Sequence, residues 1–211
     1  LMEKVFGSDI CKLKHFDISI NNFSEDEVLI SRTGFSSTDG FEIYISDINL
    51  CKPIWEKLFE KGVELNIKVG CPNLIDRIEG GLLSYGNDIN IFDSVLESGL
   101  LKFCNINSDI DCLGINSIRN EYKNGIKKLI KYFLIDSNNI GICNKPWSIM
   151  IGDNIIGQIT SSAFSPLFKK NVAIGMIDTK YTDKDNYYIK TESGKFYADM
   201  FSKPLKSYRK L

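Results

Sequence analysis

The sequence predicts an α+β protein whose first part mixes helices with strands and whose second part consists of short antiparallel strands. Three observations support this fold class. Apolar residues repeat at helical spacing over 50–61, between segments with strand patterns. Beyond about residue 115, short strand candidates and turn sequences alternate, which is typical of a small antiparallel barrel or sandwich. A length of 211 residues suits one or two domains, and we expect one over 1–115 and another over 116–211.

Glycines mark the ends of the helices that we expect in the first part. Gly7 and Gly62 suit the position just beyond a helix, where a left-handed conformation is common. The glycine pair at 80–81 ends a third helix, whose buried side we expect to include Ile78. The expected helices therefore lie around 1–6, over 50–61 and from 71–73 to 80.

The segment 41–45 is a strand candidate with strict alternation. Its period of two places Phe41 and Ile43 on one face, and Glu42 and Tyr44 on the other. A carboxylate and a phenol side by side can line a polar cleft, although a strand with one wet face is also commonplace. The other strand candidates are 17–20, 28–31, 126–135, 147–151, 155–161, 172–177 and 187–191, with turn residues at 34–40, 152–154 and 192–194.

Composition and charge argue against several classes of protein. The formal net charge is −1 and no basic stripe stands out, so we expect no binding of nucleic acid. The six cysteines form no C-x-x-C pair and there is one histidine, so we expect no metal site and reduced, mostly buried thiols in a cytoplasmic protein. No apolar run approaches the roughly 20 residues of a membrane span. The sequence does not specify an oligomeric state.

Two established kinds of active site are also disfavoured. A Ser-His-Asp triad would have to use His15, the sole histidine, which has no nucleophile motif beside it. No glycine-rich dinucleotide fingerprint or phosphate loop occurs, so a flavin or nicotinamide domain within these residues is not expected.

Three long blocks carry a resemblance to a known family. They read SRTGFSSTDGFEIY at 31–44, GCPNLIDRIEGGLLSYGND at 70–88, and TSSAFSP at 160–166 followed by KKNVAIG at 169–175. Their order and content resemble the glycine-cleavage T-protein family, whose members have a folate-binding aminomethyltransferase-like region followed by a C-terminal antiparallel barrel. The Cys-Pro-Asn sequence at 71–73 is similar to the family's dimethylsulfoniopropionate demethylase branch.

The resemblance implies a tetrahydrofolate site. Glu42 occupies the position that reads the pterin, and a carboxylate with two acceptor oxygens matches the two neighbouring donors of a pterin edge. Phe35 and Tyr44 fall where aromatic residues of the demethylase-like branch line the pocket, and aromatic rings can cover the flat ring system. At Phe35 that branch has a tryptophan, so a hydrogen bond from an indole is lost here.

Four further residues are implied as part of this site. Asn73 stands where true aminomethyltransferases have an arginine that contacts folate. Arg77 matches a second arginine of the block, with an ion pair to Glu79 as the alternative role. Tyr85 lies in the glycine-rich turn before the Asn-Asp pair at 87–88, and Tyr208 matches an aromatic that closes on folate.

The resemblance also implies a reaction, in which a small-molecule donor passes a methyl group to N5 of tetrahydrofolate. For dimethylsulfoniopropionate or a similar sulfonium donor the product is 5-methyltetrahydrofolate. The family's catalytic aspartate lies in an N-terminal segment that nothing here matches, so we expect these residues to be incomplete and weakly active alone. Two alternatives stay open: the aminomethyltransferase of glycine cleavage, and a non-catalytic folate-binding module of a dimethylglycine- or sarcosine-dehydrogenase-like protein.

Overall fold

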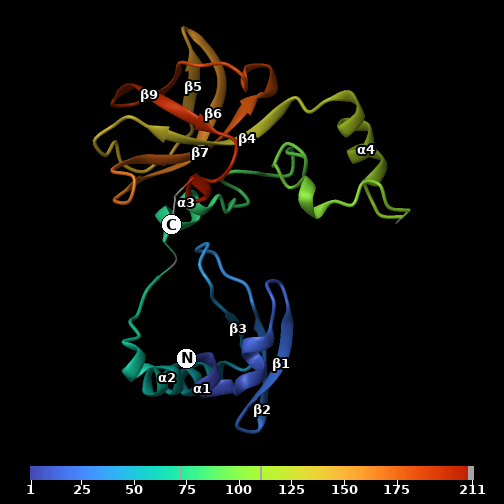
Figure 1. The fold of residues 1–211 in the computed structure, drawn as a ribbon, viewed down its shortest axis with the longest axis vertical. Coiled ribbons are helices and arrows are strands. Elements are labelled where there is room, and N and C mark those ends of the chain that lie inside the picture. The colour runs from blue at the N-terminus through green and yellow to red at the C-terminus, as the bar shows by residue number, and fades with distance from the viewer. Residues whose placement is uncertain (72, 110, 209–211) are drawn as a thin grey trace. The chain divides into compact units, whose positions relative to one another are not determined.

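A computed structural model describes residues 1–71, 73–109 and 111–208 and contains two compact units (Figure 1). The first unit comprises Leu1–Pro72 and the second comprises Asn73–Leu211. Each unit has its own hydrophobic clusters and is described by itself. The domain boundary expected near residue 115 stays a prediction.

The first unit is a three-stranded antiparallel sheet with helices on one face (Figure 1). Its strand order is β1-β2-β3, and Ser31 of β2 lies opposite Glu42 of β3. Val28, Ile30 and Ile54 are buried between the sheet and the helices. The elements are α1 (Met2–Phe6), η1 (Ser8–Lys12), β1 (Ile18–Phe23), β2 (Asp26–Ser31), β3 (Glu42–Tyr44), η2 (Ile48–Leu50), α2 (Cys51–Gly62) and η3 (Val63–Leu65).

The predicted alternation of the segment 41–45 is confirmed. Phe41, Ile43 and Ile45 pack against the hydrophobic cluster of the first unit, whereas Glu42 and Tyr44 are exposed on the opposite face. One face of the strand therefore anchors it to the core, and the other presents two polar groups to solvent.

The expectation that Gly62 lies just beyond the second helix is wrong. Gly62 is the last residue of α2 and has a φ of −91°, and the chain continues into the short helix η3 before Asn66 adopts the left-handed conformation. A Cβ at Gly62 would lie 2.5 Å from Cγ2 of Ile67. Close packing on the returning chain, and not a left-handed backbone, therefore requires the glycine.

The second unit contains a closed six-stranded antiparallel barrel with strand order β4-β7-β6-β5-β8-β9 (Figure 1). Closure decides between the barrel and the sandwich that the strand pattern left open. Phe133, Ile149 and Ile189 are fully buried in its main hydrophobic cluster. The strands are β4 (Lys128–Ile135), β5 (Trp147–Ile151), β6 (Asn154–Ser165), β7 (Lys170–Asp178), β8 (Tyr187–Thr191) and β9 (Gly194–Phe201).

The helix α3 (Leu74–Gly80) packs against the barrel strands β6 and β7. Asn73 caps its first turn, where Oδ1 accepts a hydrogen bond of 2.8 Å from the backbone N–H of Ile75. Gly81 ends the helix with a φ of 70°, as predicted. Ile78 is fully buried between the helix and the barrel. The second unit also contains η4 (Leu101–Phe103), α4 (Ile115–Asn124), η5 (Thr179–Tyr181) and η6 (Leu205–Tyr208).

One α-helix and one strand of the second unit were not among the predicted elements. The helix α4 runs between Gly114 and Gly125, and its sequence is mostly polar, although Ile115, Ile118 and Tyr122 repeat at helical spacing; Ile115 is its only described buried residue. The strand β9 follows the predicted turn at 192–194 and pairs with both β8 and β4. It closes the barrel with Phe196, Ala198 and Met200 turned to the core cluster, whereas Lys195 and Asp199 lie on the exposed face.

The cysteines are free thiols, but they are not mostly buried as expected. Cys11, Cys51, Cys71 and Cys112 are exposed, and Cys104 and Cys143 are half-buried. Burial raises the pKa of the Cys143 thiol to about 11, which keeps it protonated at neutral pH. Among the described residues, no group of three or more metal-ligating side chains could hold a metal ion. No described helix is long and apolar enough to cross a membrane.

Gly157 provides a test of the barrel packing. A Cβ at this position would lie 2.3 Å from the backbone oxygen of Met176 on the neighbouring strand, so Gly157→Ala forces the strands apart. We expect the free energy of unfolding to fall by about 1–3 kcal/mol, measured by urea denaturation followed by circular dichroism. The exposed neighbour provides the control, because Gln158→Ala should change stability little. Equal stability of the two variants would contradict this close packing of the strands.

Candidate functional site

The predicted site residues are distributed over both units. Phe35, Glu42 and Tyr44 belong to the first unit, and the others belong to the second. In the first unit, Glu42 and Tyr44 lie on the same face of β3, just after the connection from β2. In the second unit the four residues are Asn73, Arg77, Tyr85 and Tyr208.

The carboxylate of Glu42 is exposed and is oriented from one side. Its Oε2 atom accepts a short hydrogen bond from the Thr33 hydroxyl and a longer one of 3.4 Å from the Tyr44 hydroxyl. Thr33 in turn lies 2.5 Å from the hydroxyl of Ser31. Within the described parts of the chain, no hydrogen bond reaches Oε1. One oxygen is therefore held in place by hydroxyl groups while the other remains available to a ligand.

The connection that precedes Glu42 is fixed by Arg32. Its guanidinium lies 4.3 Å above the ring of Phe41, pairs with Asp39 at 3.3 Å, and donates to the backbone oxygen of Gly40. Phe35 lies in this connection and is 46% exposed, and Tyr44 is 51% exposed. Two aromatic side chains and a carboxylate are therefore accessible on these elements.

Arg77 has a different environment, because it is buried and fully engaged within the chain. It pairs with Asp88 at 2.8 Å, donates to the backbone oxygen of Leu82 at 3.1 Å, and donates to the Ser161 hydroxyl at 2.7 Å. The alternative of an ion pair between Arg77 and Glu79 is wrong, since the carboxylate partner is Asp88. Residues two apart on a helix do not face each other, so helical spacing alone disfavours Glu79, but it could not identify Asp88, which approaches only through the fold of the following turn.

Glu79 makes a second buried connection between α3 and the barrel. Its Oε1 atom accepts a hydrogen bond of 2.6 Å from the Ser165 hydroxyl, and Ser165 accepts one of 3.1 Å from the backbone N–H of Phe168. Both side chains are buried. The second and third sequence blocks are thus joined by the hydrogen bonds from Arg77 to Ser161 and from Ser165 to Glu79.

The remaining predicted residues lie at the surface of the second unit. Tyr85 is 72% exposed in the turn after α3, and Tyr208 is 49% exposed. The Tyr208 ring packs edge-on against Phe201, with 5.0 Å between the centroids. Asn73 is exposed, and its side-chain oxygen is used as the cap of α3.

Sequence reasoning gave no role to several residues that the structure brings into these networks. Thr33 orients Glu42, and Asp88 is the partner of Arg77. Thr160 and Ser161 both donate to Asp88. All four lie inside the three blocks, so the blocks themselves were the available signal.

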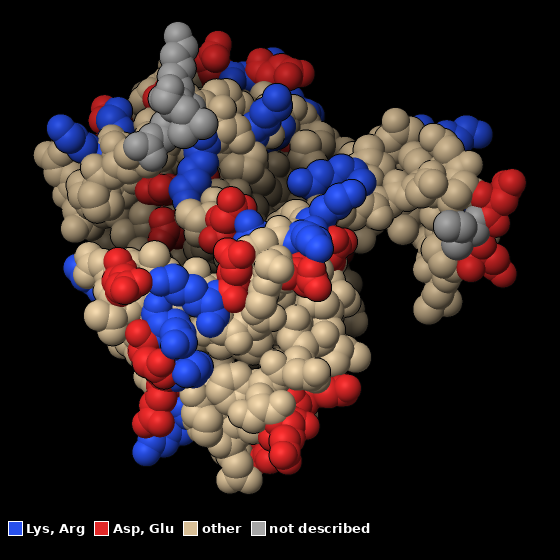
Figure 2. Space-filling view, turned by 60° about the horizontal axis from the view of Figure 1, so that its bottom comes forward, with Lys and Arg blue, Asp and Glu red and all other residues tan. Residues whose placement is uncertain are grey.

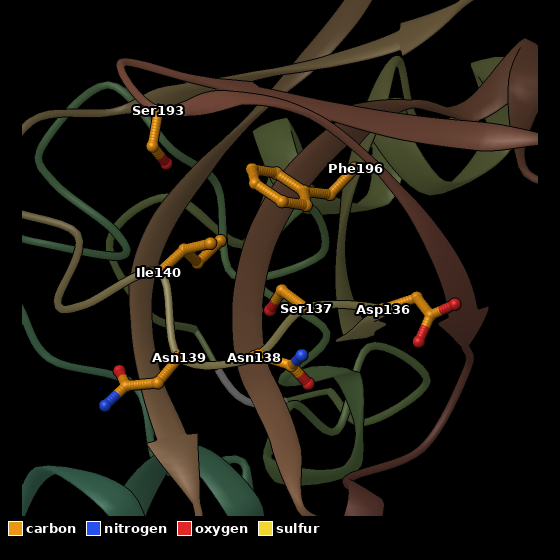
Figure 3. Close-up of a pocket in the computed structure, with 7 residues that line it drawn as sticks. All are labelled: Asp136, Ser137, Asn138, Asn139, Ile140, Ser193 and Phe196. Carbon is orange, nitrogen blue, oxygen red and sulfur yellow. The ribbon is translucent and has the colours of Figure 1, made fainter.

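The barrel surface has a depression of its own (Figure 3). The buried side chain of Asn171 on β7 holds the loop that lines this depression. It accepts a hydrogen bond of 3.1 Å from the backbone N–H of Ile140 and donates one of 2.9 Å to the backbone oxygen of Gly141. None of the seven predicted site residues lines it. The lining residues are Asp136, Ser137, Asn138, Asn139, Ile140, Ser193 and Phe196.

Charged side chains of both signs are interspersed on the face shown in Figure 2. Acidic and basic residues also form pairs at the surface, such as Lys57 with Glu60. This distribution does not provide the one-signed surface that phosphate backbones need. That the protein does not bind nucleic acid stays a prediction.

Comparison with known proteins identifies the family. Residues 1–108 match the family described as the GCVT N-terminal domain, and residues 130–206 match the glycine cleavage T-protein C-terminal barrel domain. The chain belongs to the glycine cleavage T-protein family. The second match covers most of the barrel, from β4 to the short helix after β9.

Individual relatives within the family are named for different activities. Dimethylsulfoniopropionate demethylase DmdA of Ruegeria pomeroyi is 39% identical over 181 residues, which cover 86% of this chain and 49% of the relative. An aminomethyltransferase of Bacillus mycoides is 32% identical over 191 residues, which cover 88% and 50%. The chain therefore spans about half the length of the curated relatives it matches.

A solved structure supports the family fold. The crystal structure of the glycine cleavage system aminomethyltransferase T from Bartonella henselae matches with a TM-score of 0.73 and 22% sequence identity. The match covers 84% of this chain and 49% of that chain. At this identity the likeness concerns the fold alone.

The buried pair between Arg77 and Asp88 leads to a stability prediction. Arg77→Ala leaves a buried carboxylate without its cation, so we expect the free energy of unfolding to fall by about 3–5 kcal/mol. Urea denaturation followed by circular dichroism measures this change. Lys180→Ala removes an exposed pair with Asp178 in the same unit and should have little effect. A similarly small effect of Arg77→Ala would show that the buried pair is not needed.

Proposed function

We propose that this chain binds tetrahydrofolate and takes part in one-carbon transfer, with dimethylsulfoniopropionate or a similar methyl donor as substrate and 5-methyltetrahydrofolate as product. The observation that carries the proposal is the exposed carboxylate of Glu42, with one oxygen oriented by hydroxyl groups and the other available. Membership of the glycine cleavage T-protein family supports it.

The chemistry of Glu42 fits a pterin. A pterin edge presents an amino group and a ring N–H as neighbouring donors, and a carboxylate can accept from both. Oε1 of Glu42 is available, and Oε2 retains acceptor capacity beside its contact with Thr33. Thr33 and Tyr44 reduce the freedom of the carboxylate before binding, which lowers the entropic cost of recognition.

Aromatic side chains supply the second requirement of a pterin site. Phe35 and Tyr44 expose about half of their surface, and flat rings can stack on them. Tyr44 thus has two roles, because its hydroxyl also donates to Glu42 at 3.4 Å. We also assign Asn73, Arg77, Tyr85 and Tyr208 to tetrahydrofolate binding. Arg77 would act indirectly, by holding the turn that follows α3, because its guanidinium is engaged within the chain.

Tetrahydrofolate supplies the N5 nucleophile of the proposed transfer. N5 would attack the methyl carbon, the carbon–sulfur bond would break to release a neutral thioether, and the N5 proton would leave to solvent. Because the sulfonium carries a good leaving group, the protein contributes mainly by holding N5 and the methyl carbon in line. In this proposal Glu42 fixes the orientation of the pterin ring, and the aromatic residues exclude water from its faces. Proton chemistry by a pocket aspartate is not assigned to any residue of this chain.

The choice of donor rests on similarity. The relative named dimethylsulfoniopropionate demethylase is 39% identical, compared with 32% for the relative named aminomethyltransferase. The Cys-Pro-Asn sequence at 71–73 also favours the first. Aminomethyl transfer in glycine cleavage is the second candidate, because that relative matches 88% of this chain.

Glu42 provides the test of folate binding. Glu42→Ala removes the carboxylate that accepts from the pterin, so we expect the affinity for tetrahydrofolate to fall by about tenfold to a hundredfold. Isothermal titration calorimetry of the 211-residue chain measures the dissociation constant. Glu27→Ala is the matched control, because Glu27 is an exposed glutamate of the same sheet. Unchanged affinity in the Glu42 variant would refute the central assignment.

The donor is tested by the identity of the folate product. We expect incubation with tetrahydrofolate and dimethylsulfoniopropionate to give 5-methyltetrahydrofolate, slowly, as detected by mass spectrometry. Formation of methylenetetrahydrofolate from an aminomethyl donor would instead support the second candidate. Folate binding with no product from either donor would favour a non-catalytic folate-binding module.

A further inference from the structure

Asp88 is the most completely satisfied carboxylate among the described acidic residues. Its side chain is fully buried, and Oδ2 accepts from Arg77 at 2.8 Å and from the backbone N–H of Ser84 at 2.9 Å. Oδ1 accepts from the hydroxyls of Thr160 at 2.8 Å and Ser161 at 2.6 Å. Four donors from three separate segments therefore converge on one side chain.

The two hydroxyls reach the same oxygen because β6 contains a β-bulge. Ile159 pairs with Gly175 and Ser161 pairs with Ile174, so Thr160 is the extra residue of the bulged strand. Consecutive side chains of a regular strand point to opposite faces. A bulge redirects one of them, and here it directs the side chains of Thr160 and Ser161 toward Asp88.

The hydrogen bond from the backbone N–H of Ser84 to the Asp88 carboxylate closes a tight turn over 84–88, and this turn carries Tyr85. The backbone N–H groups of Asn87 and Asp88 donate to the oxygen of Ser84 at 3.1 and 2.8 Å, and Gly86 donates to the oxygen of Ile89 at 2.7 Å. Tyr85 itself is 72% exposed. The position of its ring therefore depends on the turn backbone, which Asp88 fixes to the barrel.

We propose that Asp88, held by the β6 bulge at Thr160 and Ser161, is a positioning residue that presents Tyr85 to folate. The proposal rests on the proposed function, because it takes Tyr85 as part of the folate site. It also assigns a role to the barrel, since the hydroxyls of one bulged strand fix the orientation of a ligand-binding turn. Asp88 does not touch the ligand and acts through the turn.

A general stabilising role for Asp88 is the competing explanation, and Glu79 provides the comparison. Glu79 is also a buried carboxylate from the same segment, and it also accepts a hydrogen bond from a barrel hydroxyl, that of Ser165 at 2.6 Å. It makes no hydrogen bond to the turn 84–88 among the described residues. Glu79→Gln and Asp88→Asn each replace a buried carboxylate by an amide of similar shape, but only the second change acts on the turn.

The first measurement needs no ligand. Amide hydrogen exchange of Gly86 in the full chain reports whether the turn is closed, because this N–H donates to Ile89. We expect exchange to accelerate by at least about tenfold in Asp88→Asn, and to remain close to wild type in Glu79→Gln. If Asp88→Asn does not fold, Thr160→Val removes one hydroxyl donor with little change of shape and should accelerate exchange less strongly. Unchanged exchange in the folded variant would overturn the proposal.

The second measurement is a double-mutant cycle for tetrahydrofolate affinity. Tyr85→Ala and Asp88→Asn should each weaken binding by about tenfold, and the double variant should be no weaker than Tyr85→Ala alone. Such non-additivity is expected only if Asp88 acts through Tyr85. Additive losses, or equal losses in Glu79→Gln, would overturn the proposal. Absence of folate binding by the wild-type chain would refute the proposed function and with it the role toward folate, whereas the exchange result would still decide whether Asp88 orders the turn.

Discussion

The buried charge of Asp88 is the constraint on which the organisation of the second unit depends. A carboxylate removed from water is costly unless a cation and further donors surround it. Arg77 supplies the cation, and the hydroxyls of Thr160 and Ser161 supply donors from the barrel. The hydrogen bonds that this one carboxylate needs connect α3, the turn after it and the bulged strand β6.

The carboxylates of the sequence blocks have contrasting environments that correspond to contrasting roles. Asp88 and Glu79 are buried and engaged within the chain. Glu42 is exposed, and hydroxyl groups orient only one of its oxygens. A group with unused, oriented acceptor capacity can recognise a ligand, whereas a fully satisfied one can only hold structure. This contrast agrees with the proposals that Glu42 binds the ligand and that Arg77 acts by holding the turn after α3.

Local pattern was sufficient to predict much of the fold. Alternation in 41–45 identified both the strand and its two faces, because side chains of a strand alternate whatever lies around it. Asn73 and Gly81 marked the ends of α3 through capping chemistry that involves only neighbouring residues. The turn at 152–154 and the strands on either side of it were predicted because turn residues and strand patterns also act between neighbours in sequence. The resemblance of the blocks, not their local pattern, pointed to the candidate ligand residues.

The sequence by itself therefore determined the fold class, most strands and the exposed position of Glu42, since these follow from propensity and periodicity. Only the tertiary structure decided that Arg77 pairs with Asp88, because the turn that carries Asp88 folds back onto the helix and is held there by Ser161, 73 residues further along the chain. It also decided that β9 closes the barrel and that Gly62 makes room for Ile67. Such contacts depend on how the chain folds back on itself, which propensity and periodicity do not encode.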